Sequence, residues 1–245
     1  MTIEKLTELQ DKGYTIASRR PIELATELKA EYVKRVDKIT IDRDLSPHGK
    51  LKAKEAVEKE LAREALRSAA DIKAEYLATA NAARKLASEL LAKPHVKPKD
   101  ATQVALFERD LDDLKTAVML GVNAKRSIEA IEGFVRKHGD EPYYADQIKN
   151  QFSTLAGAVL GIESSPQNRQ ALSQVLDRVN EKVTTPEREK AAEILSFYES
   201  AENRRLFLDG SAAQKSIASI VGTVGNRLND ADRVIAEMEE VEQVE

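Results

Sequence analysis

One uninterrupted stretch constrains the fold of this chain more than any other feature. Between Pro47 and Pro94 the sequence contains no further proline, and its only glycine, Gly49, lies near the start. Ser46 stands before Pro47, and a serine followed by proline is typical of the first residues of a helix. The sequence therefore predicts a single helix over residues 46–92, about 70 Å long at 1.5 Å per residue.

Apolar and small residues follow one face of this predicted helix. They recur about every 3.67 residues, a spacing that predicts a nearly straight contact with a neighbouring helix. The stripe consists of Val57, Leu61, Ala65, Ser68, Ile72, Tyr76, Thr79, Ala83, Leu86 and Leu90. Its small members let a second helix approach closely. We expect that second helix to be residues 100–138, packed antiparallel as a helical hairpin, because only a short turn separates the two segments.

A single neighbouring helix covers only one side of such a long helix. Uncovered apolar stripes on a soluble protein bind other chains. We therefore expect the stripe to contact protein partners, among them further copies of this chain. The candidate interaction residues are Val57, Leu61, Ile72, Tyr76, Leu86 and Leu90.

Prolines and glycines divide the rest of the chain into shorter helices. Ser165-Pro166 and Thr185-Pro186 repeat the pattern of Ser46-Pro47 and predict two further helix starts. Four glycines lie where a helix is expected to end with a left-handed residue, namely Gly13, Gly139, Gly161 and Gly210. The expected helices cover residues 2–12, 20–40, 46–92, 100–138, 141–160, 165–183, 185–208 and 211–241.

The expected fold class is all-α, an elongated antiparallel helical hairpin or coiled coil with a second, smaller helical bundle. Only a short piece at residues 14–16 is expected to be extended, since the alternation typical of strands is missing elsewhere. We expect residues 1–138 to form the hairpin region. Residues 139–245 are expected to form the C-terminal bundle, whose acidic tail either frays or docks on a basic partner.

The charge balance gives the chain no overall attraction to nucleic acid or to an anionic membrane. Its 38 basic and 42 acidic residues leave a net charge of −4, whereas affinity for phosphate depends on an excess of cations. The absence of cysteine excludes disulfides and thiolate metal sites. The charged N-terminus lacks the apolar core of a signal peptide, and no stretch approaches 18 uncharged apolar residues. We expect a soluble protein that is made in a cytoplasm and binds no membrane.

Motifs for catalysis are incomplete. His48, His95 and His138 lie at helix junctions without a second ligand at the spacing of a zinc site. The stretch LFLDGSAAQKS lacks the second glycine of a phosphate-binding loop, and its Lys215 comes one residue too early. The sequence thus offers no candidate catalytic, cofactor-binding or metal-ligating residue. It predicts a protein that is not an enzyme and needs no cofactor.

Paired basic residues leave one alternative open. A nucleic-acid footprint is a stripe of one sign with aromatic platforms, whereas these pairs are scattered and flanked by acidic residues. Solvated helix faces explain them better. The alternative function is a bacterial helical adaptor or a nucleic-acid-associated binding module, and its weak candidate contacts are Arg19, Arg20, Lys34, Arg35, Arg204 and Arg205.

The segment at the start of the long helix resembles a short stretch of known proteins. Its pattern is Ile41, Asp44, Leu45-Ser46-Pro47 and Gly49-Lys50. A similar pattern recurs in small helical proteins encoded among the head and tail assembly genes of tailed bacteriophages and prophages. The resemblance implies a virion component or assembly factor that binds other coat or tail proteins, and it brings no catalytic residues with it.

Overall fold

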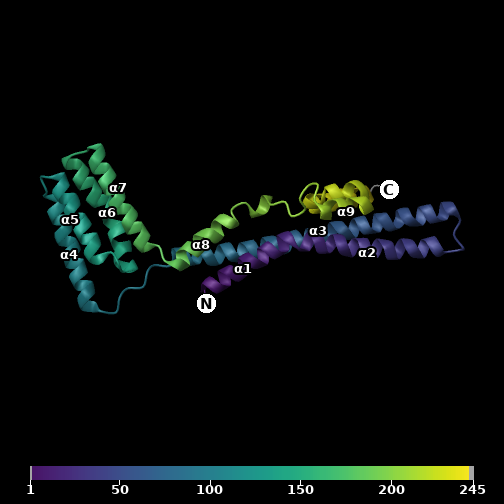
Figure 1. Cartoon of the computed structure of the whole chain (residues 1–245), viewed down its shortest axis with the longest axis horizontal. Coiled ribbons are helices and arrows are strands. Elements are labelled where there is room, and N and C mark those ends of the chain that lie inside the picture. The colour runs from purple at the N-terminus through teal and green to yellow at the C-terminus, as the bar shows by residue number, and fades with distance from the viewer. Residues whose placement is uncertain (1, 243–245) are drawn as a thin grey trace. The chain divides into compact units, whose positions relative to one another are not determined.

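Helices form the regular structure of the described chain. The computed structural model describes residues 2–242, and these residues contain no β-strand. The expected all-α class is therefore confirmed. The helices gather into two compact units (Figure 1). Unit 1 comprises the described residues of Met1–Ser88 and Glu193–Glu245, and unit 2 is the intervening segment Glu89–Ala192.

Three long helices and a C-terminal segment make up unit 1. α1 (Thr2–Ser18) and α2 (Arg20–Ile41) follow one another across a bend, and α3 (Pro47–Ala92) returns beside them (Figure 1). Pro21 has no backbone N–H, so the hydrogen-bond ladder breaks at the bend. The end of α8 (Pro186–Phe197) also belongs to this unit. The C-terminal segment then contains η1 (Ala201–Asn203), α9 (Ala212–Val221), η2 (Gly222–Asn226), η3 (Leu228–Asp230) and α10 (Ala231–Glu242).

α2 and α3 run antiparallel and are joined by residues 42–46. The Lys50 ammonium donates to the Thr40 carbonyl oxygen at 2.6 Å, and the Arg35 guanidinium donates to Glu64 at 3.0 Å. Positions earlier in α2 thus meet positions later in α3, as in a helical hairpin. The short connection leaves the chain no other way to pack these two helices side by side.

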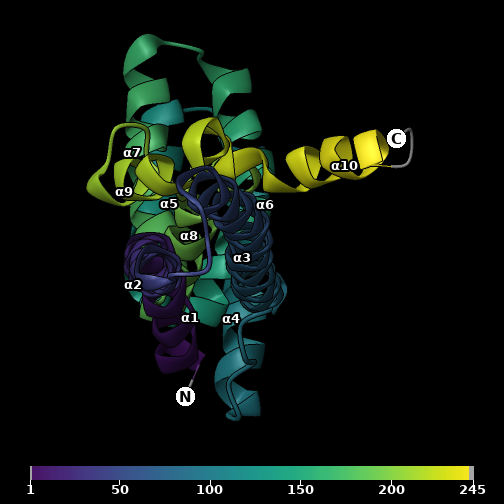
Figure 2. The same cartoon turned by 90° about the vertical axis from the view of Figure 1, so that its right-hand side faces the viewer.

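The C-terminal segment covers one side of the α2–α3 pair. α9 packs against α2, and Figure 2, which looks along the long helices, places α9 and α10 on the same side of them. Lys73 of α3 donates to the Asn229 carbonyl oxygen at 3.1 Å. The Asn229 side chain in turn accepts from the backbone of Leu206 at 2.9 Å and of Phe207 at 3.0 Å. These bonds fix the irregular segment between η1 and α9.

Unit 2 is a bundle of α4 (Ala101–Met119), α5 (Ala124–His138), α6 (Pro142–Ile162) and α7 (Pro166–Val183). Short connections reverse the chain between successive helices (Figure 1), and α6 packs against each of the other three. Their apolar stripes meet in one core, which includes Phe107, Leu111, Ile131, Ile148, Phe152, Leu155, Leu172 and Val179. Burying each such side chain stabilises the fold by about 1.5–3 kcal/mol.

Side-chain caps begin the helices at the predicted serines. The Ser46 hydroxyl accepts a hydrogen bond from the Gly49 N–H at 3.1 Å, and Ser165 caps α7 in the same way. Pro47 and Pro166 occupy the first position of α3 and α7, where a missing N–H costs no hydrogen bond. Pro186 likewise begins α8, where the Thr185 hydroxyl accepts from the Arg188 N–H at 3.4 Å. All three predicted helix starts are confirmed.

Residues 100–138 differ from the prediction of one long helix. The chain leaves α4 at Leu120, and Asn123 caps α5 by accepting from the Arg126 N–H at 3.1 Å. The antiparallel neighbour of α3 is α2 rather than this segment, whose helices belong to unit 2. The predicted pairing failed because short connections flank α3 on both sides, residues 42–46 and 93–100, so the length of the connection does not decide which neighbouring helix packs against α3.

The division of the chain also differs from the expected boundary between residues 138 and 139. That position falls between α5 and α6, which pack against each other inside unit 2. The hairpin region and the C-terminal bundle therefore do not coincide with the two units, because unit 1 is assembled from both ends of the chain.

Several expected helix ends lie elsewhere. The helix expected over 185–208 ends at Phe197, and the one expected over 211–241 is interrupted after α9, where Gly222 has a φ of 64°. Residues 14–16 are helical and belong to α1. Of the four glycines expected to be left-handed, only Gly210 has a positive φ.

Gly13 lies inside α1 at the point where a buried tyrosine approaches the helix. The Tyr198 hydroxyl donates to the Leu9 carbonyl oxygen at 2.8 Å, and burial raises the pKa of Tyr198 to about 12. Its ring centroid lies 6.0 Å from that of Tyr76 in α3. A Cβ atom on Gly13 would overlap the Tyr198 hydroxyl. The glycine therefore allows α1, α3 and α8 to meet.

We predict that Gly13→Ala destabilises unit 1, although alanine favours a helix by about 1 kcal/mol over glycine. The displaced tyrosine should cost about 1–3 kcal/mol net, as overpacking does in other cores. Chemical denaturation followed by circular dichroism measures the change. Gly157→Ala is the matched control, because Gly157 lies in helix α6 with open space around it. A Gly13→Ala variant as stable as wild type would contradict the packing described here.

Candidate interaction surfaces

Residues 29–60 form a two-helix extension, which we call the hairpin arm. None of these residues is buried, whereas Leu28 and Leu61 on either side of the arm are. Its inner seam is half-buried and consists of Tyr32, Arg35, Val36, Ile39, Leu45, Ala53, Lys54, Val57 and Glu58. Two helices share only one contact face, so the arm leaves most of its surface in solvent.

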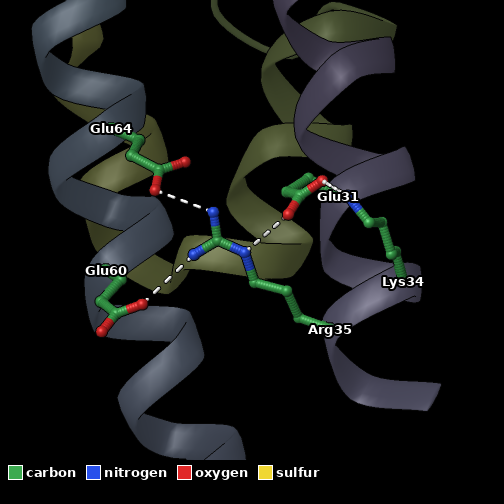
Figure 3. A network of polar contacts seen from close by, with 5 residues as sticks. All are labelled: Glu31, Lys34, Arg35, Glu60 and Glu64. Carbon is green, nitrogen blue, oxygen red and sulfur yellow. Dashed lines mark hydrogen bonds and ion pairs between the residues drawn. The ribbon is translucent and has the colours of Figure 1, made fainter. Parts of the chain in front are cut away.

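The centre of the arm is an ion-pair network around Arg35 (Figure 3). The guanidinium Nε donates to Glu31 at 2.9 Å within α2, and its two terminal nitrogens reach α3, donating to Glu60 at 3.2 Å and Glu64 at 3.0 Å. Lys34 contacts the second Glu31 oxygen at 3.2 Å. A guanidinium presents several donors in a fixed plane, so one side chain can bridge the two helices.

The charges in this network depend on one another. Hydrogen bonds from Arg35 and then Lys34 lower the pKa of Glu31, and the hydrogen bond to Glu31 is the largest cause of a raised Arg35 pKa. The three carboxylates of Glu31, Glu60 and Glu64 surround Arg35 (Figure 3). Lys34, which contacts Glu31, is the second cation of the network. Because most of these groups are exposed, salt screens their attraction. The network therefore sets the register of α2 on α3 more than it stabilises the fold.

Other polar contacts hold the rest of the arm together. The Tyr32 hydroxyl donates to Glu58 at 3.2 Å, and the Lys54 ammonium lies 3.7 Å from the same carboxylate. The ammonium is also 6.0 Å from the centroid of the Tyr32 ring. The arm is thus held closed by exposed and half-buried polar groups, in contrast to the apolar core below it.

An open groove lies beside the arm where the C-terminal segment begins to cover α3. Its volume is about 660 Å³, within the range of roughly 300–1,000 Å³ that accepts a ligand or a few side chains. α3, α9, η2 and α10 form its walls. The groove, which we call the base groove, has an apolar floor made of Ala62, Ile220, Val221, Val224, Val234 and Met238.

The structure places the predicted interaction residues in two environments. Leu61, Ile72 and Tyr76 are buried inside unit 1, so they meet a partner only if the unit opens. This corrects their predicted role, because α1, α2 and the C-terminal segment cover that part of α3. Val57 lies on the half-buried seam of the arm. Leu86 and Leu90, near the end of α3, are also half-buried.

The predicted nucleic-acid contacts are mostly neutralised within the chain. Arg19 is exposed at the bend between α1 and α2. The other five have an acidic or aromatic neighbour, and these pairs are Arg20–Glu23, Lys34–Glu31, Arg35–Glu31, Arg205–Asp209 and Arg204 over the rings of Tyr76 and Phe197. Cations whose charge is already offset contribute little to binding phosphate.

One polar cluster in unit 2 was not predicted from the sequence. Asp110 in α4 accepts hydrogen bonds from Lys137 at 2.6 Å and from His138 at 3.1 Å, when that nitrogen carries the proton. The His138 ring packs on Phe107 and Phe134. His138 is the last residue of α5, at the helix junction expected from the sequence. The cluster joins α4 to α5, and its members lie too far apart in sequence for a motif search to connect them.

Neither a metal site nor a membrane span is evident in the part of the chain that the structure describes. Within residues 2–242, no group of three or more His, Asp or Glu side chains could hold a metal ion. The described helices also lack an apolar stretch long enough to cross a bilayer. Comparison of the chain with protein-family models, curated proteins and solved structures finds no match. The functional argument therefore depends on the geometry of these surfaces.

We predict that Arg35→Met loosens the hairpin arm. The substitution keeps an unbranched apolar stem but removes the guanidinium, so Glu60 and Glu64 lose the cation that links them to α2 and Glu31 keeps only Lys34. Amide hydrogen exchange should rise across residues 29–60, while unit 2 keeps its protection. Arg20→Met, which removes an exposed pair with Glu23, is the matched control and should leave the arm unchanged. Equal protection in both variants would show that the network does not hold the arm.

A second prediction concerns the carboxyl group of Asp110. The hydrogen bond from Lys137 is the largest cause of its lowered pKa, about 2 in the folded protein. Because this pKa is below the unfolded value, near 3.9, the group stabilises the fold above about pH 4 and loses that effect as the pH falls towards 2. Lys137→Gln should raise the titration midpoint of the Asp110 carboxyl group, which NMR of the side-chain carboxyl carbons measures. Lys115→Gln, which removes the partner of Asp112, should not.

Proposed function

We propose that this protein is a non-enzymatic structural or assembly protein that acts through helix-mediated contacts with other proteins. The observation that carries the proposal is the hairpin arm, in which residues 29–60 are ordered as two helices without one buried side chain. Ordering each residue costs about 1–2 kcal/mol of backbone entropy. In the arm, burial of side chains within the chain offsets little of this cost. Binding along the arm would supply the missing burial.

The chemistry of the arm fits a protein partner better than a small ligand. Exposed apolar side chains, among them Val33, Ile41 and Leu51, alternate with charges of both signs. Such a mixture matches the polar rim and partly apolar centre of protein interfaces. A substrate pocket would instead need a concave site with convergent polar groups. We therefore favour an interaction surface over an active site.

The resemblance around the start of α3 favours one setting for these contacts, a virion component or morphogenesis factor of a tailed bacteriophage. The segment that carries the resemblance, from Ile41 to Lys50, is the tip of the hairpin arm. A pattern at the tip of a projecting hairpin is placed where a neighbouring coat or tail protein could contact it. Mass spectrometry of purified particles from the source of the chain tests this setting directly.

Site-specific photo-crosslinking in extracts of that source tests the role of the arm. We expect crosslinks to other proteins from a photoreactive residue at Val33 or Ile41, because both side chains are exposed on the arm. Ile22 is the matched control, since it is exposed on the same helix α2 but outside the arm. Crosslinks from Ile22 alone, or from none of the three, would refute the proposal. Salt-sensitive retention on DNA would favour the nucleic-acid alternative instead.

A further inference from the structure

The connection between α4 and α5 exposes three large apolar side chains almost in succession. Met119 is 67% exposed, Leu120 76% and Val122 92%. All three lie outside the core of unit 2. We call residues 119–122 the apolar turn, which closes one end of the bundle (Figure 1). Exposed apolar side chains that gather in one place mark a contact with another protein or with a membrane.

Hydrogen bonds hold the apolar turn in one conformation. The Leu120 N–H donates to the Thr116 carbonyl oxygen at 3.0 Å, and the Gly121 N–H donates to that of Val118 at 3.3 Å. A Cβ atom on Gly121 would overlap the Ser127 hydroxyl, so glycine lets the turn close against α5. Because its backbone is already ordered, the turn loses little conformational entropy when it binds.

Two cations lie directly behind the turn. Lys125 and Arg126 are exposed in the first turn of α5, which contains no acidic residue. Within the described chain, neither side chain forms a hydrogen bond or an ion pair. The Cα–Cβ bonds of a helix tilt towards its N-terminus, so both long side chains extend towards the turn. The apolar turn is therefore bordered by two positive charges that no ion pair offsets in residues 2–242.

The neighbouring connection adds a third cation at this end of unit 2. Successive helices reverse direction, so residues 163–165 between α6 and α7 lie at the same end as the apolar turn (Figure 1). Arg169, exposed in the first turn of α7, donates to the Ser164 hydroxyl at 2.9 Å, which is a neutral partner. The two connections contain one acidic residue, Glu163.

The helices behind this end contain few charges. α6 has no charged residue from Asn150 to Ile162, and the first acidic residue of α7 is Asp177. On α4 and α5, the acidic residues nearest to the turn in sequence are Asp113 and Glu129. Glu129 lies about one helical turn deeper than Lys125. Cations therefore outnumber acidic groups at this end of the bundle.

A membrane surface suits this end of unit 2 better than a protein does. The hairpin arm mixes apolar side chains with charges of both signs, which matches a protein interface. The apolar turn is instead an aliphatic tip beside an excess of cations. A protein would have to provide a matching apolar pocket rimmed by carboxylates, whereas a bilayer adapts to the tip and presents lipid phosphates around it. Apolar side chains enter a bilayer surface by about 5–10 Å, and nearby Lys and Arg bind anionic headgroups.

We propose that the apolar turn docks unit 2 on the surface of a membrane that contains anionic lipids. Its three apolar side chains enter the boundary between headgroups and acyl chains, while Lys125, Arg126 and Arg169 contact lipid phosphates. The contact is peripheral, and it goes beyond the proposed function of the hairpin arm. It also departs from the expectation that the chain binds no membrane. That expectation followed from the overall net charge of −4, whereas the excess of cations at this end is local.

Co-sedimentation of the full chain with vesicles tests the proposal. Wild type should bind vesicles of phosphatidylserine and phosphatidylcholine in equal amounts, and binding should fall in high salt and on vesicles of phosphatidylcholine alone. Val122→Asp should weaken binding by about tenfold or more, because it replaces an inserted apolar side chain by a charge. The fold should be unaffected, since Val122 is almost fully exposed. Val96→Asp, exposed in the connection before α4, is the matched control and should bind as wild type does.

A second pair of variants tests the cations. Lys125→Gln combined with Arg126→Gln should weaken binding to the mixed vesicles by about tenfold or more, because each Lys or Arg near an anionic surface contributes to the attraction. The matched control is Lys149→Gln combined with Arg178→Gln. Both of these cations are exposed, and they lie nearer to the opposite end of the bundle on α6 and α7. The control should bind as wild type does.

A fluorescent residue reports the depth of the turn, because the chain contains no tryptophan of its own. The emission of Leu120→Trp should shift to shorter wavelength on the mixed vesicles, since the indole leaves water. Lipids brominated on their acyl chains should quench it. Val96→Trp should show neither change.

Three results would overturn the inference: no binding of wild type to the mixed vesicles, unchanged binding by the folded Val122→Asp chain or by the folded double variant of Lys125 and Arg126, or no quenching of Leu120→Trp. A photoreactive residue at Val122 that crosslinks to a protein in extracts, without any vesicle binding, would assign the turn to a protein partner instead. None of these results decides the role of the hairpin arm, which the crosslinking at Val33 and Ile41 tests separately.

Discussion

The uninterrupted length of α3 is the constraint on which unit 1 depends. A helix of this length cannot fold back on itself, so every element that covers it must come from another part of the chain. α1, α2, the end of α8 and the C-terminal segment each cover a part of α3. Buried alanines, including Ala65, Ala69, Ala80, Ala83 and Ala87, lie on the side of α3 that these elements cover. Where they stop, at Leu61, the hairpin arm begins.

The hairpin arm and the rest of α3 make two different kinds of helix contact, one polar and hydrated and the other apolar and buried. From Leu61 towards the C-terminal end of α3, the contact is apolar and buried. Gly13 of α1 makes room there for Tyr198. In the hairpin arm, the contact between α2 and α3 is made by Arg35 and three carboxylates that remain largely hydrated. Surface ion pairs contribute about 0–1 kcal/mol each, so the arm has a defined register but little stability of its own. That combination suits a surface that completes its packing on another molecule.

The local features of this fold could be predicted from the sequence, and the pairing of its helices could not. Ser46-Pro47 and Ser165-Pro166 mark helix starts because capping is a matter of a few neighbouring residues. The antiparallel partner of α3 was missed because both neighbouring segments are joined to α3 by short connections, and the apolar stripe of α2, with Leu24 and Leu28, is no clearer than that of residues 100–138. The break at Leu120 was missed because the apolar stripe continues through it with only a change of phase.

The candidate surfaces were predictable to different degrees. Val57 lies on the half-buried seam of the arm, whereas Leu61, Ile72 and Tyr76 satisfied the same pattern and are buried. A stripe alone does not reveal which of its members the chain itself covers. The connection between α4 and α5 carries a signal that sequence reading could use: the exposed Met119, Leu120 and Val122 around Gly121. The base groove has no such signal, because its walls come from distant segments.

The insertion of unit 2 into unit 1 governs how the chain must find its fold. Contacts such as Tyr198 with Leu9 join residues 189 positions apart, and closing so long a loop carries a large entropic cost. The ends of unit 2 lie together, since Arg188 donates to the Lys93 carbonyl oxygen at 2.7 Å. Once the four helices of unit 2 have collapsed, the effective loop is far shorter. Folding of the inserted bundle therefore shortens the loop that must close before the end of α8 and α1 can meet.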